Sequence, residues 1–174
     1  MPALTNDRLT PSRNAEYADY PVRASTVIYS GALVALITSG TGAGNAVPAS
    51  DTLGRVILGV AQARADNSQG ADGATRVVVA FNRAFKLNLV GSAAPGDIGR
   101  CVYAVSDNEV SLSPGSNGVK VGKLLAIEPD GVWVYIHAPA PPNRAAINTV
   151  DGTYDSNEQT VITSLRNLLN DYTI

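Results

Sequence analysis

The stretch KLLAIEPDGVWVYIH, residues 123–137, decides the fold, because it combines two apolar runs with a tight turn between them. Pro129, Asp130 and Gly131 lie at the centre of the turn. Proline presets one φ angle, aspartate stabilises the bend through its own backbone, and glycine accepts a positive φ. The stretch therefore predicts a β-hairpin.

Side chains alternate along the second strand of this hairpin. One face carries Trp133 and Tyr135, and the other carries three aliphatic residues: Val132, Val134 and Ile136. A period of two indicates a strand with one buried face. If the aliphatic face belongs to the core, the aromatic face lies outside or in an interface. The alternative is that other parts of the protein cover both faces of the strand.

Five further segments show the pattern of β-strands, either as β-branched apolar runs or as alternating residues. They are Ser25–Tyr29, Ala32–Ile37, Arg55–Ala61, Thr75–Phe81 and Arg83–Val90. Turn residues separate them, and no helical period intervenes. Many short strands of this kind predict a mainly β protein, built as a closed barrel or a sandwich. We assign this small β-domain to residues 23–138.

Composition excludes several classes of protein. Of the 174 residues 16% are charged, and the formal net charge is −2, so no basic stripe is available for nucleic acid. The one cysteine, Cys101, excludes an internal disulfide, and we expect it to be a buried small hydrophobe. No apolar run reaches the roughly 18 residues that span a membrane. The first residues lack the apolar segment of a signal peptide, which favours synthesis in a cytoplasm.

Residues 1–22 differ from the strand region that follows them. They are polar, contain three prolines, and follow neither a strand nor a helix period. We interpret them as an extended N-terminal arm with little core of its own. Tyr17, Tyr20 and Val22 give this arm apolar surface to bury, so we expect these side chains to contact a partner. A disordered terminus is the alternative.

The C-terminal part changes composition twice. Residues 139–155 begin with several prolines and predict a stiff linker followed by a strand. Residues 156–174 predict a short amphipathic helix, because Ser156 and Gln159 match a capping box. Its apolar seam has heptad spacing and consists of Val161, Leu165, Leu168 and Tyr172. Such a helix is too short to stand alone in water, so it either docks on its own barrel or associates with copies of itself.

No segment has the spacing of a catalytic, cofactor or metal site. The run Gly40–Gly44 lacks the Gly-Lys-Ser/Thr ending of a phosphate-binding loop and predicts a flexible hairpin tip. His137 has no partner visible in the sequence for metal binding or catalysis. The loop Asp66–Gly73 is rich in oxygen ligands but lacks the final glutamate of a calcium loop. We therefore expect a protein that is not an enzyme and that binds no cofactor or metal.

Five phrases of the sequence form an ordered set. A strand ending in Tyr-x-Gly precedes an apolar strand at Val27–Val34, and an Ala-Val-Pro-Ala segment follows at Ala46–Ala49. Gly-Val-Ala ends a strand at Gly59–Ala61, and an Asp-x-Gly-x-x-Val-Tyr segment lies at Asp97–Tyr103. A closing hairpin spans Val119–Ile136. Taken in this order, the phrases resemble the decoration (cement) proteins on the capsids of tailed bacteriophages.

The resemblance covers roughly residues 20–138. It implies a small β-barrel or β-tulip-like domain that binds the outside of a capsid as a homotrimer. The implied partners are the major capsid protein and further copies of this chain, and the implied location is the exterior of the virion. The segment after Ala138 departs from the family pattern and is expected to form a stalk, tip or clamp. A head fibre or spike that displays a receptor- or carbohydrate-binding β-domain is the alternative function.

Overall fold

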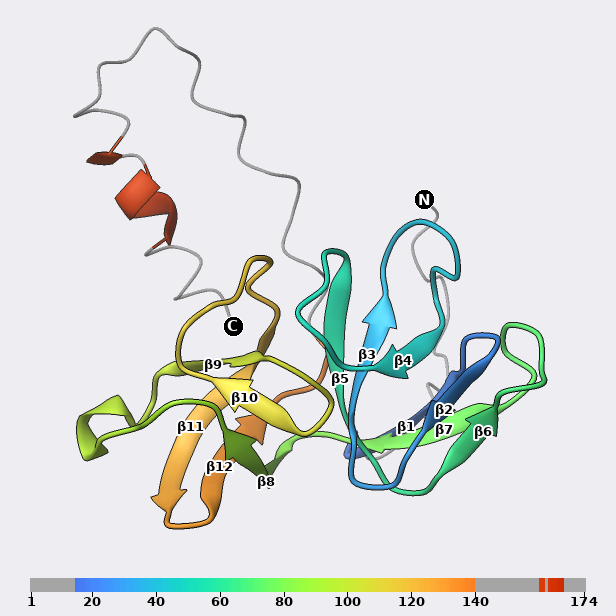
Figure 1. Cartoon of the computed structure of the whole chain (residues 1–174), viewed down its shortest axis with the longest axis horizontal. Coiled ribbons are helices and arrows are strands. Elements are labelled where there is room, and N and C mark those ends of the chain that lie inside the picture. The colour runs from blue at the N-terminus through green and yellow to red at the C-terminus, as the bar shows by residue number, and fades with distance from the viewer. Residues whose placement is uncertain (1–14, 140–159, 162, 168–174) are drawn as a thin grey trace, which may run out of the picture.

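The computed structural model describes residues 15–139, 160–161 and 163–167. These residues form twelve β-strands, the 3-10 helix η1 and part of a C-terminal helix (Figure 1). The elements are β1 (Tyr17–Pro21), β2 (Thr26–Ile28), β3 (Leu33–Ile37), β4 (Ala46–Pro48), β5 (Arg55–Ala61), β6 (Ala65–Asn67), β7 (Arg76–Ala80), β8 (Arg83–Leu89), η1 (Pro95–Asp97), β9 (Cys101–Ala104), β10 (Glu109–Ser111), β11 (Lys120–Glu128) and β12 (Gly131–Ile136). The strands assemble into a five-stranded sheet, a closed five-stranded barrel and a two-stranded sheet. The expectation of a mainly β protein with a small barrel is confirmed.

The five-stranded sheet contributes to two hydrophobic cores, one on each face. Its order is β1-β7-β5-β3-β4, and all neighbouring strands are antiparallel. Along β5, Ile57 and Val60 belong to one core, whereas Leu58 and Ala61 belong to the other. This uneven spacing follows from a β-bulge at Gly59, where the register with β3 shifts by one residue. Because both faces are covered, β5 is apolar after Arg55 instead of alternating.

The two cores differ in what they join. The smaller core packs the five-stranded sheet against β2 and β6, and it includes Ile28 and Leu58. The larger core joins the sheet to the barrel, so that Leu33 from β3 belongs to the same cluster as Leu124 and Val134 from the barrel. The larger core is continuous, and the sheet and the barrel are therefore stabilised together.

The barrel contains the predicted hairpin as β11 and β12, which pair antiparallel on either side of the turn. β8 pairs with β12, and β9 pairs with β11; β10 then closes the barrel by pairing antiparallel with β9 and parallel with β8. The aliphatic side chains of β12 are almost fully buried, whereas Trp133 and Tyr135 are partly exposed on its outward face. The prediction that the aliphatic face belongs to the core is confirmed.

Residues 15–22 belong to the folded domain, which corrects the prediction of an extended arm with little core of its own for this part of residues 1–22. β1 is hydrogen-bonded to β7 in an antiparallel register over all five of its residues. Val22 follows directly and is fully buried. The sequence pattern missed β1 because it is an edge strand with a charged residue, Asp19, on its exposed side. An edge strand also tolerates Pro21, which cannot donate a ladder hydrogen bond. Residues 1–14 lie outside the described part of the chain.

The described C-terminal residues confirm a short helix. Residues 160–161 and 163–167 are helical. The linker beyond Pro139, the capping box, Leu168 and Tyr172 lie outside the described residues. Within the ranges that the structure describes, no helix combines the length and apolar character needed to cross a membrane.

Gly122 lies at a close approach between β11 and β12. A Cβ atom at this position would lie 2.0 Å from the carbonyl oxygen of Tyr135, whereas a Cβ at Gly96 would meet nothing within 4 Å. We expect Gly122→Ala to lower the free energy of unfolding by about 2 kcal/mol, because the strands must separate to admit the methyl group. Gly96→Ala, the control, should change it by less than about 0.5 kcal/mol. Urea denaturation would measure both variants, and equal effects would contradict the close approach.

Candidate functional site

Asn82 connects the start of the folded domain to its end through hydrogen bonds. It occupies the turn between β7 and β8 with a φ of 56°, a conformation that asparagine tolerates better than most residues. Its Nδ2 donates to the carbonyl oxygen of Ala15 at 2.7 Å, and its Oδ1 accepts from the N–H of Ala138 at 2.7 Å. Its backbone N–H donates to the carbonyl oxygen of Ile136 at 2.7 Å. One residue therefore holds both segments that continue toward the chain ends.

Arg83 reinforces this junction from β8. Its guanidinium pairs with the carboxylate of Glu16 at 3.1 Å and lies 5.0 Å from the centroid of the Tyr17 ring. The carbonyl oxygen of Glu16 also accepts a hydrogen bond from the N–H of Phe81 at 3.0 Å. Each partly exposed contact contributes about 1 kcal/mol or less. Together they fix the direction in which the chain enters β1.

The structure separates the three side chains that were predicted to contact a partner. Val22 is fully buried in the core formed with β2 and β6, and Tyr20 packs against the same core. Tyr17 is 43% exposed and stands beside the Asn82 junction. The partner-binding prediction for Val22 is wrong, since its side chain has no surface to offer. Of the three, Tyr17 presents the most surface.

The apolar seam is uncovered in the described part of the C-terminal helix. Val161 is 57% exposed and Leu165 is 53% exposed. Large apolar side chains at helical spacing favour a partner when their own chain leaves them in solvent. Within the described residues, these two side chains are therefore surface that a partner could cover.

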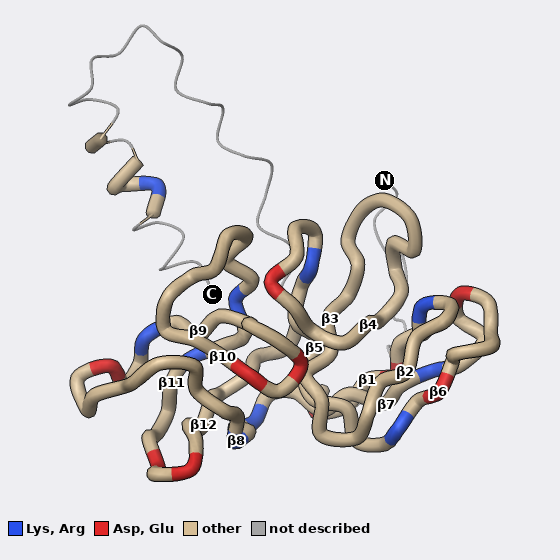
Figure 2. Tube along the Cα trace, in the orientation of Figure 1, with Lys and Arg blue, Asp and Glu red and all other residues tan. Residues whose placement is uncertain are grey.

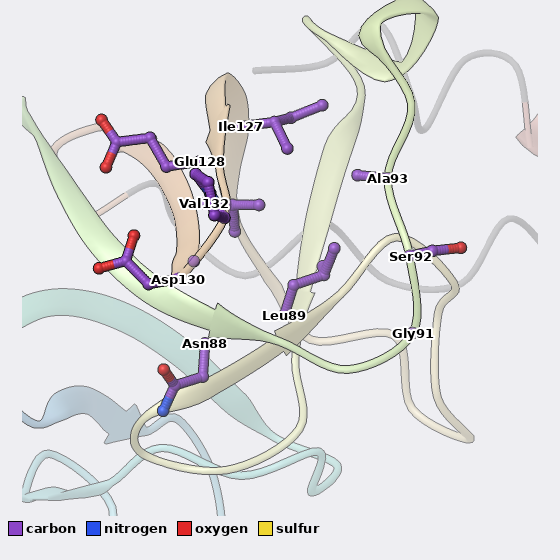
Figure 3. A pocket seen from close by; sticks show the side chains of 11 residues that line it. Asn88, Leu89, Gly91, Ser92, Ala93, Ile127, Glu128, Asp130 and Val132 are labelled. Atoms are coloured by element: carbon purple, nitrogen blue, oxygen red, sulfur yellow. The ribbon is translucent and has the colours of Figure 1, made fainter.

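A pocket of about 320 Å³ lies beside the turn between β11 and β12. Leu89, Ala93 and Ile127 contribute apolar side chains to its lining. The carboxylates of Glu128 and Asp130 stand on the side opposite Ala93 (Figure 3). The pocket is thus mixed in character, with an apolar part and an acidic edge.

Lys86 bridges the two carboxylates at this edge. Its Nζ donates to Glu128 at 2.6 Å and also donates to Asp130. These hydrogen bonds hold the pKa of Glu128 and the pKa of Asp130 below their ordinary values, and they raise the pKa of Lys86. Acidic residues accordingly gather at the turn between β11 and β12 (Figure 2). Two carboxylates against one ammonium leave a net negative charge there.

The two residues with reactive side chains stand apart from these features. The His137 ring meets the Tyr135 ring edge-on, with 4.8 Å between the centroids. Cys101 is partly exposed, which corrects the expectation of a buried cysteine. The reason is its place on β9 opposite Lys123, whose side chain shares the outward face of the barrel. In the described ranges, no three His, Cys, Asp or Glu residues group so as to hold a metal ion.

Sequence patterns did not single out Asn82 or Lys86. An asparagine between two apolar strands is a turn signal that could have indicated Asn82. Lys86 meets Glu128 only through the pairing of β8 with β12, across 42 residues of sequence. No family model, curated protein or solved structure matches this chain.

The same substitution, valine to alanine, can be compared at a buried position, Val22, and at an exposed one, Val78. Val22 is fully buried, and Val78 on β7 is 45% exposed. We expect Val22→Ala to lower the free energy of unfolding by about 2 kcal/mol, because it leaves a cavity. Val78→Ala should cost below about 1 kcal/mol. Chemical denaturation would check both values, and a small loss at Val22 would contradict its place in the core.

Lys86→Met should change the acid titration of the turn. Glu128 and Asp130 have folded pKa values below their ordinary ones, so the stability they contribute is present above the unfolded pKa and is lost as the pH falls through the folded pKa. Without the ammonium, we expect both pKa values to rise and the loss of stability on acidification to become smaller. Carboxyl-carbon NMR titration would measure the shifts, with Lys123→Met as control. Unchanged pKa values in Lys86→Met would refute the bridge.

Proposed function

We propose that this protein is a structural virion protein that binds the outside of a tailed-bacteriophage capsid as a homotrimer and holds neighbouring major capsid proteins together. The resemblance of its ordered phrases to decoration proteins is the starting point. Those phrases coincide with elements of the fold: Val27–Val34 runs from β2 into β3, Ala46–Ala49 contains β4, and Gly59–Ala61 ends β5. Asp97–Tyr103 leads from η1 into β9, and Val119–Ile136 contains β11 and β12.

The observation that carries the proposal is the junction at Asn82. Its side chain bonds to Ala15 and to Ala138, so the segments that precede and follow the folded body start from the same region. A cement protein needs one segment that reaches a neighbouring capsid subunit and another that joins its own copies. A shared starting point allows both tasks to act together, because copies joined through their C-terminal segments also bring their N-terminal segments close. Weak capsid contacts are then multiplied by avidity.

The exposed helix seam supports the homotrimer. Val161 and Leu165 are more than half exposed in the single chain. Burial of a large apolar side chain contributes roughly 1.5–3 kcal/mol relative to exposure. A trimer buries the seam of each copy against the other two, which offsets part of the entropy lost on association.

A head fibre or spike is the second candidate, and the outward face of β12 favours it. Trp133 and Tyr135 stand partly exposed on this face, with His137 against Tyr135. The hydrogen bond from Lys86, and after it one from Trp133, lower the pKa of Glu128, so the indole lies beside this carboxylate. Oriented aromatic rings on a strand suit stacking against a receptor or a sugar.

Charges placed in the seam test the proposal. We expect Val161→Asp combined with Leu165→Asp to shift the protein toward monomer in sedimentation, because unpaired charges are costly to bury. Binding to undecorated capsids should weaken at the same time, by about tenfold or more through lost avidity. Thr163→Asp is the control, since Thr163 lies on the same helix away from the seam.

The outcomes separate the two candidates. A parent protein that is trimeric but does not bind capsids would overturn the cement proposal. If the parent then binds host cells or glycans, and Trp133→Ala abolishes that binding, the fibre candidate gains support. A seam variant that keeps its mass and its capsid occupancy would show that the helix does not join the copies.

A further inference from the structure

We infer that Arg23 and Arg55 form a binding site for an oxyanion, a carboxylate or phosphate group, beside the hairpin loop Gly40–Gly44. The loop joins β3 to β4. The site lies in a part of the fold that the cement proposal does not use, and it stands or falls independently of that proposal.

Arg55 supplies a donor that lacks an acceptor. It stands at the start of β5, opposite Ile37 at the end of β3. Its Nε is buried and has no hydrogen-bond partner among the residues that the structure describes. A buried donor without an acceptor costs about 1–3 kcal/mol, and more when the group is charged. An oxyanion beside the guanidinium would supply the missing acceptor.

Arg23 approaches the same loop. A Cβ atom at Gly42 would lie 3.2 Å from Nε of Arg23 and also 3.2 Å from Cδ1 of Ile37. Because Ile37 is the register partner of Arg55, the two arginines flank one loop. The backbone of Arg23 is held in place, since its N–H donates to the carbonyl oxygen of Ala46 at 3.0 Å.

The two guanidiniums are not neutralised by any carboxylate in the described ranges. Four other arginines pair with an Asp or Glu, namely Arg64, Arg76, Arg83 and Arg100. Asp72 lies next to Ala24, the residue after Arg23, but its carboxylate accepts a hydrogen bond from the backbone N–H of Ala24 at 2.7 Å and forms no ion pair with Arg23. Burial and then the neighbouring charge of Arg23 lower the pKa of Arg55, as expected for like charges held close together without a counter-ion.

The arginines, rather than the loop amides, are the groups that would hold the anion. The N–H of Ala43 donates to Gly40, that of Gly44 to Ile37, and that of Asn45 to Gly42. These bonds stabilise the loop internally and occupy three of its amides. Guanidinium groups carry planar forks of donors that match the oxygens of a carboxylate or a phosphate.

NMR titration of the full chain tests the site, with the Nε–Hε signals of its arginines as reporters. Sodium phosphate and sodium acetate would be added in separate arms, with sodium chloride keeping the ionic strength constant. We expect saturable shifts at Arg23 and Arg55 in at least one arm. The stronger arm identifies the source as a phosphate or as a protein carboxylate. Shifts that grow linearly in both arms, as with chloride alone, would overturn the inference.

Matched variants separate binding from general effects on the fold. Arg23→Met should weaken the anion affinity about tenfold, the factor that corresponds to one charge-assisted hydrogen bond. Arg64→Met should leave it unchanged, because Arg64 pairs with Asp66 elsewhere. Equal affinities in these two variants would contradict a site at Arg23.

Two glycines provide a second test that does not remove an arginine. Gly42 and Gly44 have φ values of +81° and +87°, so alanine strains the backbone similarly at both, but only at Gly42 would its Cβ meet Arg23. We expect Gly42→Ala to reduce the anion affinity several-fold more than Gly44→Ala. Equal effects would overturn the site even if Arg23→Met does not fold. Retained anion binding in a protein that ignores capsids would count against the cement proposal alone.

Discussion

The fold depends on burying both faces of one sheet. The strands β5 and β3 contribute side chains to two cores at once, so neither the barrel nor the β2-β6 pair can be removed without exposing apolar surface. In β3 ordinary alternation achieves this, whereas in β5 the bulge at Gly59 changes the spacing, so that Ile57 and Val60 belong to one core and Leu58 and Ala61 to the other. A Cβ at Gly59 would lie 2.1 Å from the carbonyl oxygen of Ala80. The bulge therefore also brings the backbones of β5 and β7 together.

Local patterns predicted the parts of the fold in which one strand face is buried. The alternation of β12 placed its aliphatic residues correctly, and the Pro129-Asp130 turn located the hairpin. Apolar runs also predicted β3 and β5, which lie between the two cores. The pattern failed at β1, which lies at an edge of the sheet. β1 has a single neighbour, so its hydrogen bonds to β7 depend on a partner about sixty residues away in sequence. Such a contact leaves no periodic mark on the strand itself.

The candidate sites follow the same division. Residue types predicted a hairpin tip at Gly40–Gly44, and this loop joins β3 to β4, which pair antiparallel. Sequence patterns did not indicate the arginines beside this loop. Arg23 and Arg55 come together only through the register of β3 and β5 and through the approach of Arg23 to Gly42. Val22 was misjudged for a similar reason: its apolar character was evident, but its neighbours come from other strands.

The Asn82 junction determines how the folded body would carry mechanical load. Ala15 and Ala138 are both tied to one side chain, so a pull on the two chain ends acts across a few hydrogen bonds instead of along the sheet. Those hydrogen bonds would break one after another before the load reaches the barrel and the central sheet. A domain pulled through both of these segments would thus yield first at Asn82.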